Sequence, residues 1–214
     1  MTVQTGAPRR RGRPGYDRET LIARSIEIFN ERGYHGTSMD ALARELGITK
    51  SAIYHHVGSK EDLLEQAIAQ GLNQLFAVID SQDARTEISA EERLRAVICG
   101  SVEVLITYRD SVALLLRVRG TSAAERRALE KRREIDERTR ALVEAAIAEG
   151  SLRSDIDPGL ITRLLFGMVN SLTEWYRPRP DRDAEIVAEA VATIAFEGLR
   201  ALSLPPAEKQ NSCR

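Results

Sequence analysis

Residues 37–60 read TSMDALARELGITKSAIYHHVGSK and contain two short segments with apolar residues at helical spacing, separated by Gly47. Glycine between two such segments favours a tight turn. Thr49 can cap the second helix, and Ile48 and Ile53 on either side of it have the spacing of a hydrophobic staple. The stretch therefore predicts a helix-turn-helix in which the staple fixes the angle of the second helix.

With Ile53 turned toward the core, the second helix has an outer face that suits DNA. Lysine suits phosphate or guanine, serine and tyrosine hydroxyls suit phosphate oxygens, and a small alanine can meet a thymine methyl. The residues left on this face are Lys50, Ser51, Ala52, Tyr54 and His55. Lys60 begins a further helix capped by Ser59, where the free backbone amides favour a phosphate.

Two other roles are open to His55 and His56, metal binding and catalysis. Adjacent residues on a helix diverge by about 100°, so the two rings do not converge on one metal. No cysteine, and no glutamate at a partner spacing, completes a metal site, and no nucleophile with an orienting acid is recognisable nearby. DNA contact is favoured for His55, and packing against the neighbouring helix is favoured as strongly for His56.

The N-terminal residues 1–16, MTVQTGAPRRRGRPGY, contain four arginines and no acid. Glycine and proline at positions 12, 14 and 15 prevent a helix. Such a segment is commonly a solubilising disordered tail. The alternative is an arm that enters the minor groove, where narrow A·T tracts attract arginine. Its place directly before a helix-turn-helix favours the arm, with Arg11 and Arg13 as candidate contacts.

Charge is distributed unevenly along the chain, although its net value is −1. Residues 1–60 hold ten Lys or Arg against six Asp or Glu, a balance of +4 that leaves −5 for the remaining residues. A basic head on an acidic body fits nucleic acid bound by one end of the molecule.

The two cysteines, Cys99 and Cys213, stand far apart and match no metal or redox spacing. Cys99 lies in an apolar helical run and is expected to be a small core residue. No apolar run approaches the roughly 20 residues of a membrane span, and the N-terminus lacks the apolar region of a secretory signal. The sequence therefore predicts a cytoplasmic protein without a membrane partner.

The remaining sequence predicts helices only. An acidic cap at Asp17 opens the first helix, which ends before Gly33, and a long helix from Ser59 through Ile79 joins head to body. Residues 81–87 form a polar linker. Further helices are expected to begin at the capping boxes Ser89/Glu92 and Ser122/Glu125, near Ser111, at Asp157-Pro158 and near Asp183.

The segment KRREIDERTR, residues 131–140, allows two interpretations. Its apolar stripe, if continued, places Arg132, Asp136 and Thr139 on the buried side. One interpretation is a solvated surface helix, which is slightly preferred because many of these charges can pair at i, i+4. The other is a pocket wall, in which arginine holds an anionic ligand.

The run RETLIARSIEIFNERGYHGTSMDALARELGITKSAIYHHVGSKEDLL, with GRP before it, resembles the DNA-binding domain of the TetR family of bacterial transcriptional regulators. The resemblance spans about residues 12–65. It implies that Thr37, Tyr54, His55 and Lys60 grip phosphates, while bases are read by Lys50, Ser51 and Ala52. Val57 replaces the usual phenylalanine of the YxHF motif and Ser25 the usual alanine, both at core positions. The full set of expected DNA contacts is Arg11, Arg13, Thr37, Ser38, Thr49, Lys50, Ser51, Ala52, Tyr54, His55 and Lys60.

The same resemblance implies a homodimer in which the last two long helices of each subunit form a four-helix interface. Two heads then read a near-palindromic double-stranded DNA operator. The segment GMVNSLTEWYRP, residues 167–178, resembles a motif in TetR-type regulators of fatty-acid, aromatic-acid and steroid degradation, whose effectors are often acyl-CoA thioesters. It implies that Phe166, Asn170 and Arg132 line a ligand channel. Trp175 and Tyr176 are preferred as dimer-interface aromatics.

The sequence thus predicts an all-α chain in four parts: a flexible basic arm (1–16), a three-helix helix-turn-helix domain (17–62), a larger helical ligand-binding and dimerisation domain (63–204) and a disordered tail (205–214). The expected function is a repressor released by a small-molecule effector, without a catalytic residue, cofactor or metal. A ligand-dependent activator or a ligand-free regulator of the same fold stays open. So does a helical acyl-thioester enzyme, although the sequence shows no catalytic constellation for it.

Overall fold

The computed structural model describes residues 16–179 and 183–199, so the expected contacts Arg11 and Arg13, most of the expected arm, the expected tail and Cys213 lie outside the described residues. The described part is all-α, as predicted, and forms nine helices. They are α1 (Arg18–Arg32), α2 (Met39–Leu46), α3 (Lys50–His56), α4 (Lys60–Asp83), α5 (Ala90–Thr107), α6 (Arg109–Leu116), α7 (Ala123–Ala148), α8 (Pro158–Trp175) and α9 (Ala184–Leu199).

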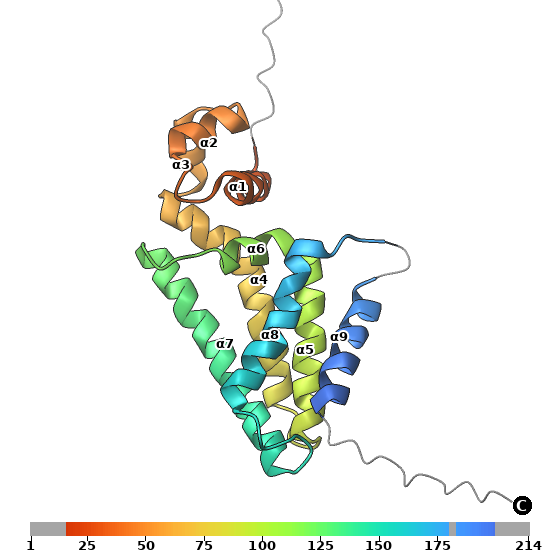
Figure 1. Cartoon of the computed structure of the whole chain (residues 1–214). Coiled ribbons are helices and arrows are strands. Elements are labelled where there is room, and N and C mark those ends of the chain that lie inside the picture. Colours follow the sequence, from red (N-terminus) through yellow and green to blue (C-terminus); the bar gives the residue numbers. More distant parts are fainter. Residues whose placement is uncertain (1–15, 180–182, 200–214) are drawn as a thin grey trace, which may run out of the picture.

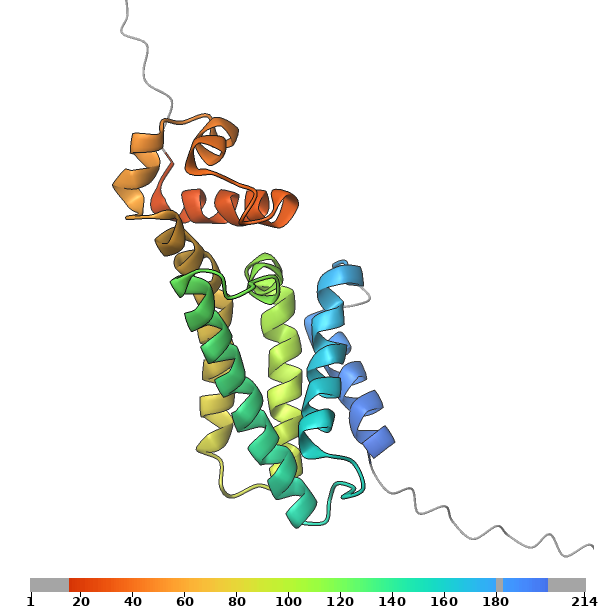
Figure 2. The same cartoon turned by 60° about the vertical axis from the view of Figure 1, so that its left-hand side comes forward.

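The helices form a small head and a larger body (Figures 1 and 2). The head consists of α1–α3, and α4 runs from it into the body. Since α4 is continuous from Lys60 to Asp83, the expected boundary between residues 62 and 63 falls inside a helix. None of the helices in the described ranges has the length and apolarity that a membrane crossing requires.

The predicted helix starts and stops are present. Both capping boxes form, with Ser89 and Ser122 each accepting from the backbone of the glutamate three residues on. Asp157 caps α8 with Pro158 at its first position. After α1 and α2 the chain turns at Gly33 and Gly47, whose φ angles of 80° and 66° favour glycine.

Two boundaries differ from the expected ones. Residues 81–83, expected in a polar linker, continue α4, because Arg93 and Arg138 hold its C-terminal end. Arg93 Nε donates to the carbonyl of Gln82 at 2.8 Å, and Arg138 pairs with Asp83. The helix expected near Ser111 begins earlier, at Arg109, and ends at Leu116.

The core of the body surrounds α5, which packs against α4, α7, α8 and α9. Its inward face is fully buried at Leu94, Val97, Ile98 and Val102. Cys99 is half-buried beside this face, and its thiol lies 3.8 Å from the carbonyl oxygen of Ala188 in α9. These contacts bury the apolar stripes that the sequence predicts, and most of the folding free energy comes from such burial.

Head and body meet at a polar junction around Glu125, the third residue of α7, whose side chain is 1% exposed. It accepts hydrogen bonds from the backbone amides of Arg119, Thr121 and Ser122 and from the hydroxyl of Thr121. Its other partner comes from the head, because His35 Nε2 lies 3.0 Å from Glu125 Oε1. Burial alone raises the pKa of a carboxyl group, but these hydrogen bonds outweigh it and lower the pKa of Glu125 to about 2.

We expect Glu125→Gln to lower the free energy of unfolding by about 1–3 kcal/mol at pH 7, since an amide cannot accept all of these bonds. The folded pKa lies below the unfolded value, so the carboxylate stabilises the fold fully above pH 4.5 and loses this effect as the pH falls toward about 2. Urea titrations at several pH values measure it.

The exposed neighbour variant Glu130→Gln serves as the matched control and should keep the wild-type profile. The free energy of unfolding of the wild type should fall as the pH is lowered. In Glu125→Gln this fall should be smaller. Identical profiles for the two variants would show that the junction carboxylate contributes nothing to the folded state.

Candidate DNA-binding surface and ligand cavity

The helix-turn-helix has the geometry that the sequence predicts. Ser38 caps α2 by accepting from the Ala41 amide at 3.1 Å, and Thr49 caps α3 by accepting from the Ala52 amide at 3.2 Å. Ile53 is fully buried, and Ile48 packs against the same core. Because α3 is anchored at both its start and its middle, its outer face has a fixed orientation.

The outer face of α3 is exposed at Lys50, Ser51, Tyr54 and His55, and Ala52 is half-buried. Tyr54 is 44% exposed, unusual for so large a side chain. Lys50 forms an ion pair with Asp40 of α2 at 3.0 Å, and this hydrogen bond raises the pKa of the lysine. In the free protein the ammonium of Lys50 is thus held by Asp40 on the exposed side of the helix-turn-helix.

Thr37 does not lie on this surface, so the expectation that its side chain grips a phosphate does not fit the structure. The residue is 1% exposed, and its hydroxyl donates to the carbonyl of Gly33 at 2.9 Å. It braces the turn between α1 and α2 from within. The sequence pattern did not show this, because a threonine before a helix start is equally suited to cap, brace or contact.

Lys60 also departs from its expected role. Its ammonium donates to the carbonyl of Tyr34 at 2.6 Å and lies 4.2 Å from the centre of the Tyr34 ring. The side chain is half-buried, and burial lowers its pKa. In this conformation the lysine ties the start of α4 to the turn between α1 and α2.

The two histidines of α3 stand edge to face, with ring centroids 5.3 Å apart. His55 is exposed and His56 half-buried, an arrangement that suits contact for the first and packing for the second. Within residues 16–179 and 183–199, no group of three or more His, Cys, Asp or Glu side chains is placed to hold a metal ion.

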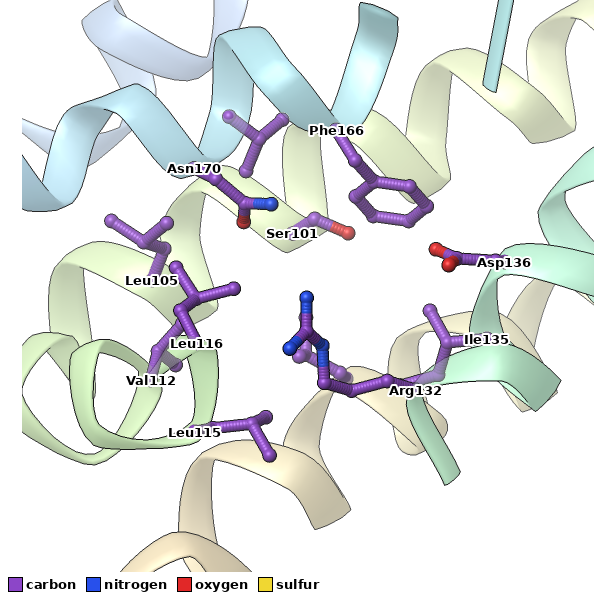
Figure 3. A pocket seen from close by; sticks show the side chains of 12 residues that line it. Ser101, Leu105, Val112, Leu115, Leu116, Arg132, Ile135, Asp136, Phe166 and Asn170 are labelled. Atoms are coloured by element: carbon purple, nitrogen blue, oxygen red, sulfur yellow. The ribbon is translucent and has the colours of Figure 1, made fainter. Parts of the chain in front are cut away.

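A cavity of about 50 Å³ lies in the body between α4, α5, α6, α7 and α8 (Figure 3). Its wall is mostly apolar, and its lining residues are Leu75, Ser101, Leu105, Val112, Leu115, Leu116, Arg132, Ile135, Asp136, Phe166, Val169 and Asn170. It contains all three residues expected to line a ligand channel. Small-molecule pockets are usually several times larger, at roughly 300–1,000 Å³. A ligand therefore has to separate the surrounding helices to enter.

Arg132 is the polar centre of this cavity. Its guanidinium points into the space between Phe166, Asn170 and the α6 leucines (Figure 3). The side chain is half-buried, and no hydrogen bond or ion pair joins it to another residue of the described part. The preferred interpretation of residues 131–140 as a solvated surface is thus wrong at Arg132, although Arg133 and Arg140 are exposed.

The rest of the cavity lining was not anticipated. Its apolar members have the helical spacing of ordinary core residues, so no local signal separates a cavity wall from a filled core. Asp136 lies at the rim. Burial raises its pKa, and the charges of Arg132 and Arg163 act in the opposite direction.

The short helix α6 connects this cavity to the head. Val112 and Leu115 line the cavity, while the carbonyl of Asp110 on the same helix accepts from Asn30 Nδ2 of α1 at 2.9 Å. Just beyond α6, Arg117 donates to the Asn30 carbonyl at 2.6 Å. Figure 2 shows α6 end-on directly beneath α1. Two hydrogen bonds thus tie Asn30 of α1 to α6 and to the residue that follows it.

Large apolar side chains are exposed on the outer sides of α8 and α9. They are Leu160, Leu164 and Trp175 of α8 and Ile186 and Ile194 of α9. Ile194 is 70% exposed, so nothing in the described protomer covers it. Tyr176, expected beside Trp175 at a dimer interface, is instead 3% exposed within the core of its own chain. The chain leaves the helix at this residue and turns its ring inward.

Family models match both the N-terminal and the C-terminal part of the chain. A family model described as tetracyclin repressor-like, C-terminal domain, matches residues 87–199. A model for bacterial regulatory proteins of the tetR family matches residues 21–67. The HTH-type transcriptional repressor KstR2 of Rhodococcus jostii is 29% identical over 185 residues, which cover 85% of this chain and 90% of KstR2.

Solved structures agree. A crystal structure of a TetR-family transcriptional regulator from Streptomyces coelicolor is 48% identical, with a TM-score of 0.79 over 85% of this chain and 92% of that chain. AibR, solved in complex with isovaleryl coenzyme A and operator DNA, is 23% identical, with a TM-score of 0.69 over 84% of this chain and 97% of AibR. The likeness to AibR concerns the fold.

The exposed hydroxyl of Tyr54 suits a phosphate, so we expect Tyr54→Phe to weaken DNA binding by about 1 kcal/mol, or roughly fivefold. The loss should be equal on a duplex selected by the wild-type protein from a random library and on an unrelated duplex, because phosphates carry no sequence information. Fluorescence anisotropy measures both affinities. Tyr108→Phe removes the same hydroxyl from the body and should leave both unchanged. A loss confined to the selected duplex would instead indicate base recognition.

Proposed function

This chain belongs to the TetR family of bacterial regulatory proteins, and on that premise we propose that it represses transcription as an effector-released homodimer. The proposal rests on one observation above all. The guanidinium of Arg132 projects into an otherwise mostly apolar cavity and forms no hydrogen bond or ion pair within the described residues, although the charge of Asp136 lies nearby. A buried-facing cation without an acceptor is costly in a core and useful in a binding site.

The effector that this lining suits is a largely apolar acyl group with a carbonyl oxygen. Phe166 and the leucines of α6 would pack on the acyl chain, while Arg132 and Asn170 would donate to the carbonyl. AibR, which shares this fold, was solved with an acyl-CoA and operator DNA together. An acyl-CoA thioester is therefore the effector class we propose.

The release mechanism follows from the size of the cavity and the place of α6. Because about 50 Å³ cannot hold an acyl chain, the effector selects a state in which α6, α7 or α8 has moved outward. Movement of α6 is transmitted to α1 through Asn30 and thus reorients the head. The ligand shifts the population of states by its preference for the expanded one.

On DNA, the exposed residues of α3 would enter the major groove. We assign base recognition to Lys50, Ser51 and Ala52 and phosphate contacts to Tyr54 and His55, with Ser38 and Thr49 at the helix starts facing the backbone. Two such heads, related by a two-fold axis, bind half-sites about 34–36 Å apart or a multiple of that distance. A repositioned head no longer matches this spacing.

The exposed apolar surface of α8 and α9 supplies the two-fold contact in this proposal. Its side chains, Leu164 and Ile194 foremost, are too large and too numerous to be left in water by a stable protomer. A second copy of the same surface buries them in a self-complementary four-helix arrangement.

Arg132→Ala is expected to keep operator affinity within about twofold and to raise at least tenfold the acyl-CoA concentration needed for release, since the lost bonds involve a charged donor. Release is followed by fluorescence anisotropy with acetyl-, isovaleryl-, octanoyl- and benzoyl-CoA. Lys131→Ala, an exposed neighbour on α7, is the control and should respond as the wild type. Wild-type sensitivity in Arg132→Ala would exclude this arginine from the effector site.

Ile194→Asp should convert the dimer into a monomer with unchanged helix content, because an unpaired carboxylate in an apolar interface costs several kcal/mol. Sedimentation velocity and far-UV circular dichroism give both readouts. Ala23→Asp introduces the same charge at an exposed position of α1 and should remain dimeric. A dimeric Ile194→Asp protein would place the two-fold contact elsewhere.

A further inference from the structure

A second recess, of about 210 Å³, opens at the surface between α7 and α8 and adjoins the cavity. Its lining residues are Arg133, Asp136, Glu137, Arg140, Gly159, Thr162 and Arg163. We call it the outer recess. Asp136 lines both the cavity and the outer recess, so the two spaces meet at this side chain.

The residues of the cavity and of the outer recess follow one side of each helix. Along α7, Arg132, Asp136 and Arg140 are spaced by four residues, so they lie on one side of the helix. Along α8, Arg163 and Phe166 share a side with the cavity residue Asn170, at spacings of three and four. Arg132 of the cavity and Arg140 of the outer recess are therefore about 12 Å apart along α7.

The arginines of the outer recess are only partly paired. Arg140 pairs with Glu144 at 2.9 Å, whereas Arg133 and Arg163 form no ion pair with any residue of the described ranges. Asp136 and Glu137 also line the recess, so with Glu144 three acids balance its three arginines. Arg132 at the junction then gives an excess of one positive charge. Guanidinium groups grouped in this way suit phosphate, which they bind in a bidentate fashion.

We propose that the outer recess binds the phosphates of a coenzyme A thioester whose acyl group occupies the cavity. The inference rests on the proposed function. It concerns the nucleotide part of the effector, which the cavity does not contact. A thioester joins an apolar acyl group to a pyrophosphate through a long, narrow pantetheine arm. Along α7 the protein offers features in the same order: an apolar cavity, a polar donor at Arg132, and the arginines of the outer recess about 12 Å further on.

A free acid or an uncharged ligand would not contact the arginines of the outer recess. A carboxylate in the cavity would reach Arg132 but none of the arginines of the outer recess. The structure thus favours a nucleotide-bearing thioester over the corresponding free acid, and it assigns the difference in affinity to Arg133 and Arg163.

The test compares two probes that differ in the phosphorylated nucleotide, and the salt dependence isolates the part that the phosphates play. For each acyl group of the panel acetyl, isovaleryl, octanoyl and benzoyl, the CoA thioester and the S-acyl pantetheine are titrated by isothermal calorimetry. Wild-type protein should bind the best CoA thioester at least tenfold more tightly than its pantetheine counterpart, with an advantage that shrinks as salt is added. The double variant Arg133→Ala/Arg163→Ala should lose this advantage and keep its affinity for the pantetheine.

Two further variants make the test specific. Arg153→Ala removes a surface arginine that pairs with Asp155 in the α7–α8 loop, outside the outer recess, and should bind both probes as the wild type does. Glu137→Gln removes a negative charge from the recess and should tighten CoA binding by about twofold to fivefold, with no effect on the pantetheine. An effect of opposite sign from the arginine variant cannot arise from a general loss of stability.

The outcomes separate the two proposals. If no thioester of either kind binds, both the proposed acyl effector and the proposed phosphate site in the outer recess are wrong. If both probes bind with equal affinity to wild-type protein, the acyl effector stands and the phosphate site is overturned. If the CoA advantage survives in Arg133→Ala/Arg163→Ala, the phosphates bind elsewhere and the assignment to the outer recess is wrong.

Discussion

The position of α6 is the constraint on which the rest of the molecule depends. This short helix lines the cavity on one side and contacts α1 of the head on the other. Its seat on α4 is fixed by a close crossing: Ser111 donates to the Ala67 carbonyl at 2.8 Å, and a Cβ added at Gly71 would lie 2.9 Å from Val112. So tight a contact resists sliding. The helix is therefore held closely to α4, the element that carries the head.

Polar bonds link head and body above α6. They include Asn30 to Asp110 and His35 to Glu125, and they lie beside the apolar contacts of a core that runs through both parts. Each such bond contributes on the order of 1 kcal/mol net. Allosteric coupling usually amounts to about 1–3 kcal/mol, so replacing one or two of these bonds is sufficient to redistribute the states. The amide and hydroxyl partners of Glu125 belong to the body and not to the head.

Local chemistry in the sequence was sufficient to predict the helices, both capping boxes and the buried Ile53, since each depends on residues within one turn of helix. What failed depends on contacts distant in sequence. Lys60 turns to Tyr34, 26 residues away, and Thr37 is buried by the packing of the whole head. Tyr176 is drawn into the core after its helix ends. Arg132 lies in a charged run whose pattern indicates solvent, and only the arrangement of five helices makes a cavity around it.

The placement of Arg132 also explains why the free protein keeps so small a cavity. A guanidinium facing apolar walls is stabilised only by water or by Asp136 nearby, so enlarging the cavity without a ligand would expose apolar surface and gain no hydrogen bond. A ligand that brings both an acyl chain and an acceptor would cover the exposed apolar surface and supply the missing hydrogen bond. In the proposed mechanism the closed geometry is thus favoured in the free chain and the expanded one in the complex, which is the difference in affinity that a switch requires.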